Sequence, residues 1–320
     1  MRNCIIVLFL LCPLASGIVL HPGSEPPANW SGRPPSAVLG RWNTNASCVV
    51  ISPGCIITTR HQGGAYGSTA EIDGVSYKAV RIVEYPDSEA DIRIAKLRYA
   101  NFAEHVSINS TVNERGSDVV LGGYGKYRDD DPNNQIDYGY EWTGDNSQIH
   151  WGSNEFGWLD YKNENGDIDL LKLDFDCPGE TDYECSIAEY DSGGGIFYNN
   201  GQEWLLMGVF YSVDTKYGNR AYYLNRDTKL PDPQTIYAHR ARDFQNWADQ
   251  TIADLSNCGS NPADIDEDCR VNEADIKELA KNWLKTSPTG NAAESDVNSD
   301  DAVNMLDFAE IFQSWQDDYY

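Results

Sequence analysis

The chain has 320 residues, of which 50 are acidic and 24 are Lys or Arg, so its formal charge at pH 7 is −26. A hydrophobic content of 41% is too high for a disordered acidic chain, and the length predicts about two domains. The acidic excess argues against nucleic acid or anionic membranes as partners, because it would repel their phosphates.

Residues 1–17 have the pattern of a secretory signal peptide. Arg2 is followed by an apolar run that ends at Leu11, and small residues follow at Ala15–Gly17. The run is too short to cross a bilayer, and no other stretch approaches about 18 apolar residues. The sequence therefore predicts a protein that is secreted, extracellular or associated with the cell surface, without a transmembrane anchor.

Removal of this peptide leaves six cysteines in three local couples. An even number in an exported chain favours disulfides over metal-binding or catalytic thiols. Local pairing is one of many possible connectivities. The couples are Cys48/Cys55, Cys177/Cys185 and Cys258/Cys269.

Short β-like runs follow an irregular, Pro- and Gly-rich segment at residues 18–37. They extend from about Val38 to Tyr223 and are separated by Gly, Asn and Asp, a pattern typical of an all-β sandwich or barrel. Apolar residues at helical spacing then predict a helix over about 237–255. The predicted strands include residues 48–51, 55–59, 75–83, 92–97, 119–121, 170–175 and 205–211.

Three segments of the β region carry groups that together can perform nucleophilic catalysis. His61 ends a β-like run, Asp91 opens another, and Ser192 lies in a Gly-rich turn. A serine becomes nucleophilic when an imidazole accepts its proton, and the imidazole needs a carboxylate to fix its tautomer. Asp169 opens a similar segment and is a second candidate for the acid, but it lies much closer to Ser192 in sequence.

An acidic repeat fills the C-terminal region. Two 12-residue segments, 264–275 and 296–307, each lead into an apolar helical pattern, predicted at 276–284 and 308–316. Oxygen-bearing side chains stand at positions 1, 3, 5, 9 and 12 of both, and a backbone carbonyl at position 7 completes the ligand set that calcium requires. The first segment offers Asp264, Asp266, Asp268, Arg270 (carbonyl), Asn272 and Asp275, and the second offers Asp296, Asn298, Asp300, Ala302 (carbonyl), Asn304 and Asp307.

A solvated acidic surface would explain a charge run, but it does not explain two copies with identical offsets. We therefore predict about two calcium ions per chain. At position 6, where Gly takes a positive φ at low cost, the repeats carry Cys269 and Asp301, and both end in Asp instead of Glu.

The β region resembles the trypsin/chymotrypsin-like serine proteases. The resemblance is carried by Thr-Thr-Arg-His ending at His61, by Asp-Ile-Arg-Ile-Ala-Lys-Leu starting at Asp91, and by Asp-Ser-Gly-Gly around Ser192. It spans about residues 38–257, and we expect the domain to cover 18–258. The resemblance implies two six-stranded antiparallel β-barrels with a C-terminal helix and a cleft between them. His61 would be the general base and acid, Asp91 would orient it, and Ser192 would be the nucleophile.

The sequence departs from that family at several positions. The family's oxyanion hole uses the amides of the serine and of a glycine two residues earlier, and here these residues are Ser192 and Tyr190. Gln62 replaces a cysteine, and Ser186 stands near the base of the specificity pocket, without an acid for Arg or Lys substrates. Asp191 would either receive the amino group of a new N-terminus at Ile18 or hydrogen-bond its own turn.

Residues 261–316 resemble the type I dockerin module. The resemblance rests on the duplicated loop and helix and on Val-Asn at 271–272 and 303–304. It implies a cohesin-type partner, and we expect this domain to cover 261–318.

The combined prediction is a secreted serine endopeptidase tethered to a cohesin-type partner through a calcium-binding dockerin. The alternative is a catalytically inactive, protease-like binding or structural module recruited in the same way. A glycosidase is suggested only by the dockerin, since no pair of carboxylates supports it.

Overall fold

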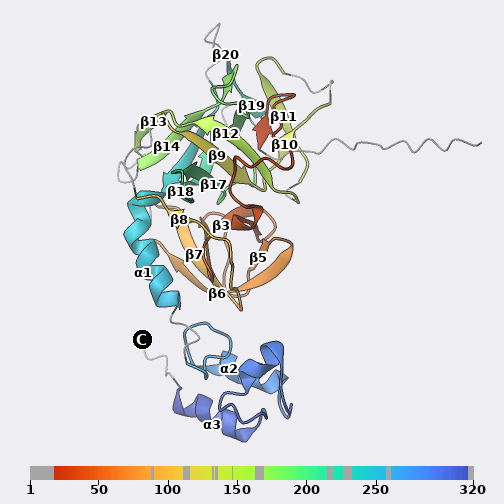
Figure 1. Ribbon diagram of the computed structural model, residues 1–320, viewed down its shortest axis with the longest axis vertical. Helices are drawn as coiled ribbons and strands as arrows, with labels where there is room; N and C mark the ends of the chain where they lie inside the picture. The colour runs from red at the N-terminus through yellow and green to blue at the C-terminus, as the bar shows by residue number, and fades with distance from the viewer. Residues whose placement is uncertain are drawn as a thin grey trace, which may run out of the picture.

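The computed structural model describes residues 18–87, 90–110, 116–131, 133, 136–145, 147–162, 169–214, 218, 220–225, 233–256 and 261–315. The predicted signal peptide at 1–17, the predicted boundary at 258, and residues 316–318 lie outside these ranges. Figure 1 shows two β units stacked along the long axis, with a small helical unit beyond the first of them.

The first β unit is a closed barrel. Its strands follow the order β2-β3-β4-β7-β6-β5, and each is antiparallel to its neighbours. Trp42, Val50, Ile56 and Leu97 belong to the cluster of fully buried side chains inside it. The strands are β2 (Leu39–Trp42), β3 (Ala46–Ser52), β4 (Cys55–Thr59), β5 (Thr69–Ile72), β6 (Val75–Glu84) and β7 (Ile92–Leu97).

The second β unit is an eight-stranded sheet that curves into a half-barrel. Seven strands follow the order β12-β9-β17-β18-β21-β14-β13, and β8 pairs with β18 from the side. The predicted chymotrypsin-like architecture is confirmed, with a half-barrel in place of the second closed barrel. The strands are β8 (Ser107–Ile108), β9 (Asp118–Gly123), β12 (His150–Glu155), β13 (Trp158–Lys162), β14 (Asp169–Asp174), β17 (Gly195–Asn199), β18 (Trp204–Val213) and β21 (Thr235–Arg240).

Three small sheets lie beside the half-barrel, and the N-terminal residues take part in one of them. Ile18, Val19 and Leu20 are buried, although the sequence predicts an irregular segment there. In these sheets β1 (Val19–Leu20) pairs with β16 (Cys185–Ser186), β11 (Gly139–Thr143) lies between β10 (Tyr127–Arg128) and β19 (Arg220–Tyr222), and β15 (Asp176–Cys177) pairs with β20 (Leu224–Asn225).

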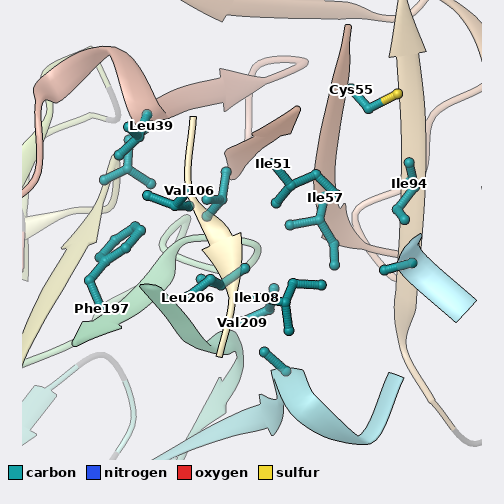
Figure 2. Close-up of a cluster of buried hydrophobic side chains, with 14 of the residues drawn as sticks. Leu39, Ile51, Cys55, Ile57, Ile94, Val106, Ile108, Phe197, Leu206 and Val209 are labelled. Atoms are coloured by element: carbon teal, nitrogen blue, oxygen red, sulfur yellow. The ribbon is translucent and has the colours of Figure 1, made fainter. Parts of the chain in front are cut away.

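A hydrophobic core joins the two β units. Ile57 and Ile94 enter it from the barrel, whereas Phe197, Leu206 and Val209 enter it from the half-barrel, as Figure 2 shows. All five side chains are fully buried, so this core fixes the position of one unit relative to the other.

One long helix closes the β region. A 3-10 turn (Ala241–Phe244) leads into α1 (Gln245–Ser256), which packs Ala248 and Leu255 against the shared core. The helix begins later than the sequence predicts, because residues 235–240 form β21. Ile236 and Ala238 alternate into the half-barrel core there, and β21 is held between β14 and β18.

The C-terminal unit contains α2 (Glu273–Lys281), a 3-10 helix (Gly290–Ser295) and α3 (Met305–Gln313) around its own small core. Both helices begin three residues before their predicted starts. Asn272 and Asn304 are the N-caps, so Asp275 and Asp307 occupy the third helical position and complete a capping box. A 3-10 helix (Ser36–Val38) precedes β2.

Two of the three predicted cysteine couples are wrong. Cys48 and Cys55 are free thiols, because Cys48 points into the barrel and Cys55 points to the shared core on its other side. Cys177 and Cys185 are also thiols. Cys269 is disulfide-bonded, and Cys258, its predicted partner, lies outside the described residues.

In the part of the chain that the structure describes, no helix combines the length and the apolar character needed to cross a membrane.

Candidate active site and calcium loops

Strand pairing brings His61 and Asp91 together. β4 and β7 are antiparallel, with Thr59 opposite Ile92, so His61, two residues after β4, and Asp91, directly before β7, emerge at the same end of the barrel. The amide of Arg60 also donates to the Asp91 carbonyl over 3.3 Å. The two side chains therefore share one edge of the barrel.

The three predicted catalytic residues form a continuous chain of contacts. The Asp91 carboxylate accepts the His61 amide over 2.8 Å through Oδ1, and its Oδ2 contacts His61 Nδ1. On the other side of the ring, His61 Nε2 lies 3.1 Å from Ser192 Oγ. An imidazole held in this way carries its proton on Nδ1 and directs the lone pair of Nε2 toward the serine.

The turn that carries Ser192 is anchored to the barrel by Ser47. The Ser47 amide donates to the Ser192 carbonyl over 2.9 Å, and its hydroxyl donates to the Tyr190 carbonyl over 3.0 Å. Gly193 follows at φ +86°, where a Cβ atom would lie 2.2 Å from the Ser47 carbonyl oxygen. Only glycine meets both conditions, so the turn requires it.

Asp191 fixes the inner side of the same turn. Its carboxylate is fully buried and accepts amide hydrogens from Gly125 over 2.7 Å and Ala188 over 2.9 Å. Burial raises the pKa of Asp191 to about 7, although both amides favour the charged form. Of the two roles considered for Asp191, the bond to its own turn is present through the Ala188 amide, and the Gly125 amide adds a second bond from outside the turn.

Tyr190 occupies the first position of the candidate oxyanion hole. Its φ is +77°, a left-handed conformation that a side chain makes unfavourable. Among the residues that the structure describes, neither its amide nor that of Ser192 donates to a protein acceptor. Lys126 lies over the Tyr190 ring, with Nζ 5.4 Å from the centroid. The amides of Tyr190 and Ser192 are therefore the two groups of this turn that could donate to a substrate oxyanion.

Sequence reasoning missed a second histidine close to this site. His239, on β21, is buried, and its ring lies 4.8 Å from that of Tyr211. The Tyr211 ring in turn meets His61 edge-on at 6.1 Å. Burial lowers the pKa of His239 to about 4, so it is neutral at pH 7. A histidine alternating with the apolar residues of a strand was the available signal, hidden by the helix predicted there.

Gln62 also contacts the site. Its Nε2 lies 2.9 Å from His61 Nε2, the same nitrogen that faces Ser192. Asp169 begins β14, between β13 and β21, whereas the carboxylate that touches His61 belongs to Asp91. Ser186 is buried in β16 and donates to the neighbouring Ile187 carbonyl over 3.3 Å.

The first calcium loop gathers three carboxylates. Ligand oxygens of Asp264, Asp266 and Asp268 lie within 4.8 Å of one another, a spacing that suits one hard cation. Asp275 accepts the amides of Asp266 over 3.3 Å and Asn272 over 2.7 Å. Burial raises the pKa of Asp275 to about 6.

The second loop repeats this geometry with a different third carboxylate. Oxygens of Asp296, Asp300 and Asp307 lie within 4.8 Å of one another. Asp307 accepts the amides of Asn298 over 3.2 Å and Asn304 over 2.8 Å, as Asp275 does in the first loop. The donor sets therefore fit calcium in both copies.

Position 6 has a positive φ in both loops, as the loop turn requires. Cys269 has φ +72° and Asp301 has φ +65°, so the backbone of each residue adopts a left-handed conformation that usually favours glycine. At position 9, the side-chain oxygens of Asn272 and Asn304 accept the amides of Ala274 and Leu306. These two predicted ligands thus also act as helix caps.

Comparison with solved structures finds distant likenesses to serine proteases. The inactive form of the Rv3671c protease of M. tuberculosis has 14% identity and a TM-score of 0.44, and covers 67% of this chain and 89% of its own. Neuropsin, a serine protease expressed in the limbic system of mouse brain, has 10% identity and a TM-score of 0.48, with 68% and 95% covered. Likenesses this distant say nothing about the chemistry of the chain. No curated protein matches it.

The C-terminal unit has a clear relative among protein families. Its two calcium loops, each followed by a capped helix, fall within residues 262–313, which match the dockerin type I domain. The chain therefore carries a dockerin type I domain in its C-terminal region.

Proposed function

We propose that the β region is a serine endopeptidase. The observation that carries the proposal is the His61 imidazole, which contacts the Asp91 carboxylate with Nδ1 and lies 3.1 Å from Ser192 Oγ with Nε2. A nucleophile, a base and an orienting acid in this order are the parts that peptide hydrolysis through an acyl-enzyme requires.

In the proposed reaction, Ser192 Oγ attacks the scissile carbonyl and its proton passes to His61 Nε2. The resulting imidazolium is stabilised by Asp91, and the amides of Tyr190 and Ser192 donate to the developing oxyanion. His61 then protonates the leaving amine. Water repeats the sequence on the acyl-enzyme and frees Ser192. The contact between Gln62 and His61 Nε2 has to open when Ser192 donates.

An inactive, protease-like binding module is the second candidate. The observation that favours it is Tyr190, whose side chain occupies a position where φ is +77°. If that backbone shifts on substrate binding, one oxyanion donor is lost, which lowers the rate by about 10²–10³-fold.

We further propose that the protein works outside the cell, tethered through its dockerin to a cohesin-type partner. Bound calcium would cross-link the carboxylates of each loop and hold the following helix against the small core. The exposed apolar side chains of Met305, Leu306 and Phe312 on α3 support a role for this helix in contacting another protein.

A fluorophosphonate separates the two candidates, because it reacts only with an activated serine. We expect an adduct on Ser192 of the wild-type chain, loss of labelling in His61→Ala, and casein hydrolysis that disappears in Ser192→Ala. Labelling that is unchanged in His61→Ala would contradict the proposed base. A folded wild-type chain that neither labels nor hydrolyses casein would support the binding module.

A further inference from the structure

The two calcium loops lie in different surroundings. In the first loop, Asp264 and Asp266 are buried, at 6% and 0% exposure. In the second loop, Asp300 is exposed and Asn298 is partly exposed. The difference arises because the first loop and α2 pack against the β-barrel, on the side shown at the lower end of the β region in Figure 1.

Tyr66 of the barrel reaches a residue of the first calcium loop. Its hydroxyl donates to Asp266 Oδ2 over 2.7 Å. The other oxygen of the same carboxylate accepts the Asp268 amide over 3.2 Å, which orients the group within the loop. A carboxylate has about four lone-pair positions, so both contacts leave room for a cation.

Residues directly after β7 provide a second set of contacts. Arg98 forms an ion pair with Glu278 of α2, with Nη1 3.1 Å from Oε1, and its Nη2 donates to the Ile265 carbonyl over 3.4 Å. The Tyr99 amide donates to Glu267 over 3.3 Å. Because the Arg98 and Glu278 side chains are only 17% and 16% exposed, their attraction is screened less than that of a surface pair.

Electrostatic repulsion makes the docking of the C-terminal unit onto the barrel depend on whether a cation occupies the first loop. The first loop concentrates Asp264, Asp266 and Asp268 in one place, and their mutual repulsion opposes the arrangement that Tyr66 meets. A divalent cation removes that repulsion. By linkage, contacts made only in the docked arrangement raise the affinity of the first loop for the cation, and the cation strengthens docking by the same factor.

We propose that calcium in the first loop clamps the dockerin domain onto the β-barrel, and that Tyr66 is a positioning residue of this site supplied by the other domain. The inference rests on the proposed calcium binding but not on the proposed peptidase activity. Tyr66 belongs to the loop that follows His61. Arg93 holds that loop by donating to the Gly63 and Gly64 carbonyls, each over 3.0 Å. The clamp therefore closes on the segment next to the candidate active site.

Calcium titration calorimetry on the full chain tests the clamp. We expect two bound ions in wild type, and Tyr66→Phe to weaken one of them about 10-fold while the other keeps its affinity. Tyr138→Phe, which removes the hydroxyl of another exposed tyrosine, is the matched control and should leave both affinities unchanged. If Tyr66→Phe binds both ions with the same affinities as wild type, the clamp is overturned but the proposed calcium binding is not.

Hydrogen exchange measures the docking itself. Removal of calcium from the wild-type chain should increase amide exchange in residues 63–68 and 98–99, while the half-barrel strands keep their protection. Arg98→Gln should produce the same increase with calcium present. Unchanged exchange in both experiments would overturn the clamp, and the absence of any calcium heat in wild type would remove the calcium proposal together with it.

Discussion

Asp91 and Asp169 open segments that look alike in sequence, and the structure separates them. Both precede alternating apolar residues, but only Asp91 begins next to the strand that delivers His61. Asp169 pairs with Lys162 of β13 in the half-barrel. The choice between the two acids therefore depends on strand pairing, which the local sequence does not specify.

We predict that Asp91→Asn lowers kcat for peptide hydrolysis by about 10⁴-fold, because the amide no longer holds the imidazole in the productive tautomer. Asp169→Asn should leave kcat unchanged. Steady-state kinetics of both variants on one peptide substrate decide the matter. A large loss in Asp169→Asn with little loss in Asp91→Asn would reverse the assignment.

Glu184 is a buried acid outside the chain of contacts that joins Asp91, His61 and Ser192. It is 2% exposed and accepts two hydrogen bonds from Thr181, from its hydroxyl over 3.0 Å and its amide over 3.3 Å. Burial raises the pKa of Glu184 to about 8, above its ordinary value of 4.5. Between pH 4.5 and about pH 8, Glu184 of the folded chain therefore keeps a proton that the unfolded chain has released.

This proton makes stability fall as the pH rises. The contribution is fully present below pH 4.5 and is lost as the pH passes through about 8. Relative to Glu184→Gln, the free energy of unfolding of wild type should decrease by about 4 kcal/mol between pH 4.5 and pH 9. Urea unfolding at saturating calcium measures the difference, and a difference that is constant with pH would contradict the buried state of this group.

At the scale of elements, each stretch that the sequence predicts as a strand overlaps a strand of the structure, namely β3, β4, β6, β7, β9, β14 or β18. β4 was found from a largely apolar run, and β7 from the alternation of apolar residues with Arg93 and Lys96, and both patterns favour a strand. β21 was missed because only Ile236 and Ala238 carry its apolar alternation, and because a 3-10 turn leads from it into α1. The pattern was interpreted with a helical period, but the neighbours of β21 in the sheet decide its conformation.

The shared core between barrel and half-barrel aligns the serine with the histidine. Leu206 is fully buried in it, and removal of its side chain should cost about 2–5 kcal/mol of unfolding free energy. Leu284→Ala, at a position that is 74% exposed, is the control and should change stability by less than about 0.5 kcal/mol. Denaturant unfolding of both variants checks this. Equal losses would mean that the core is not where the structure has it.

At the scale of the whole molecule, the repeats and the order of His, Asp and Ser were visible in the sequence, but the contact between domains was not. Tyr66 and Asp266 are 200 residues apart. Neither residue has a local pattern that points to the other, because their contact follows from the packing of two separately folded units. The predicted disulfide between Cys48 and Cys55 is wrong for a related reason. The two residues are close in sequence, but their side chains lie on opposite sides of the barrel wall.

Chelation of calcium should unfold the C-terminal unit and leave the β units intact. The small core there contains few residues, and without cations its two acidic loops repel themselves. We expect the helical circular dichroism signal to decrease on addition of a chelator and to return with excess calcium. A helical signal that is the same with and without the chelator would contradict a structural role for the ions.

The unpaired sulfur atoms of the β region have a practical consequence. Cys48 lies inside the barrel, Cys55 in the core between the units, and Cys185 in the half-barrel core, and all three are buried. An alkylating reagent such as iodoacetamide can reach each one only when its own region opens. Mass spectrometry of the alkylated peptides would thus report the opening of three parts of the native fold separately, with reporters that the chain already carries.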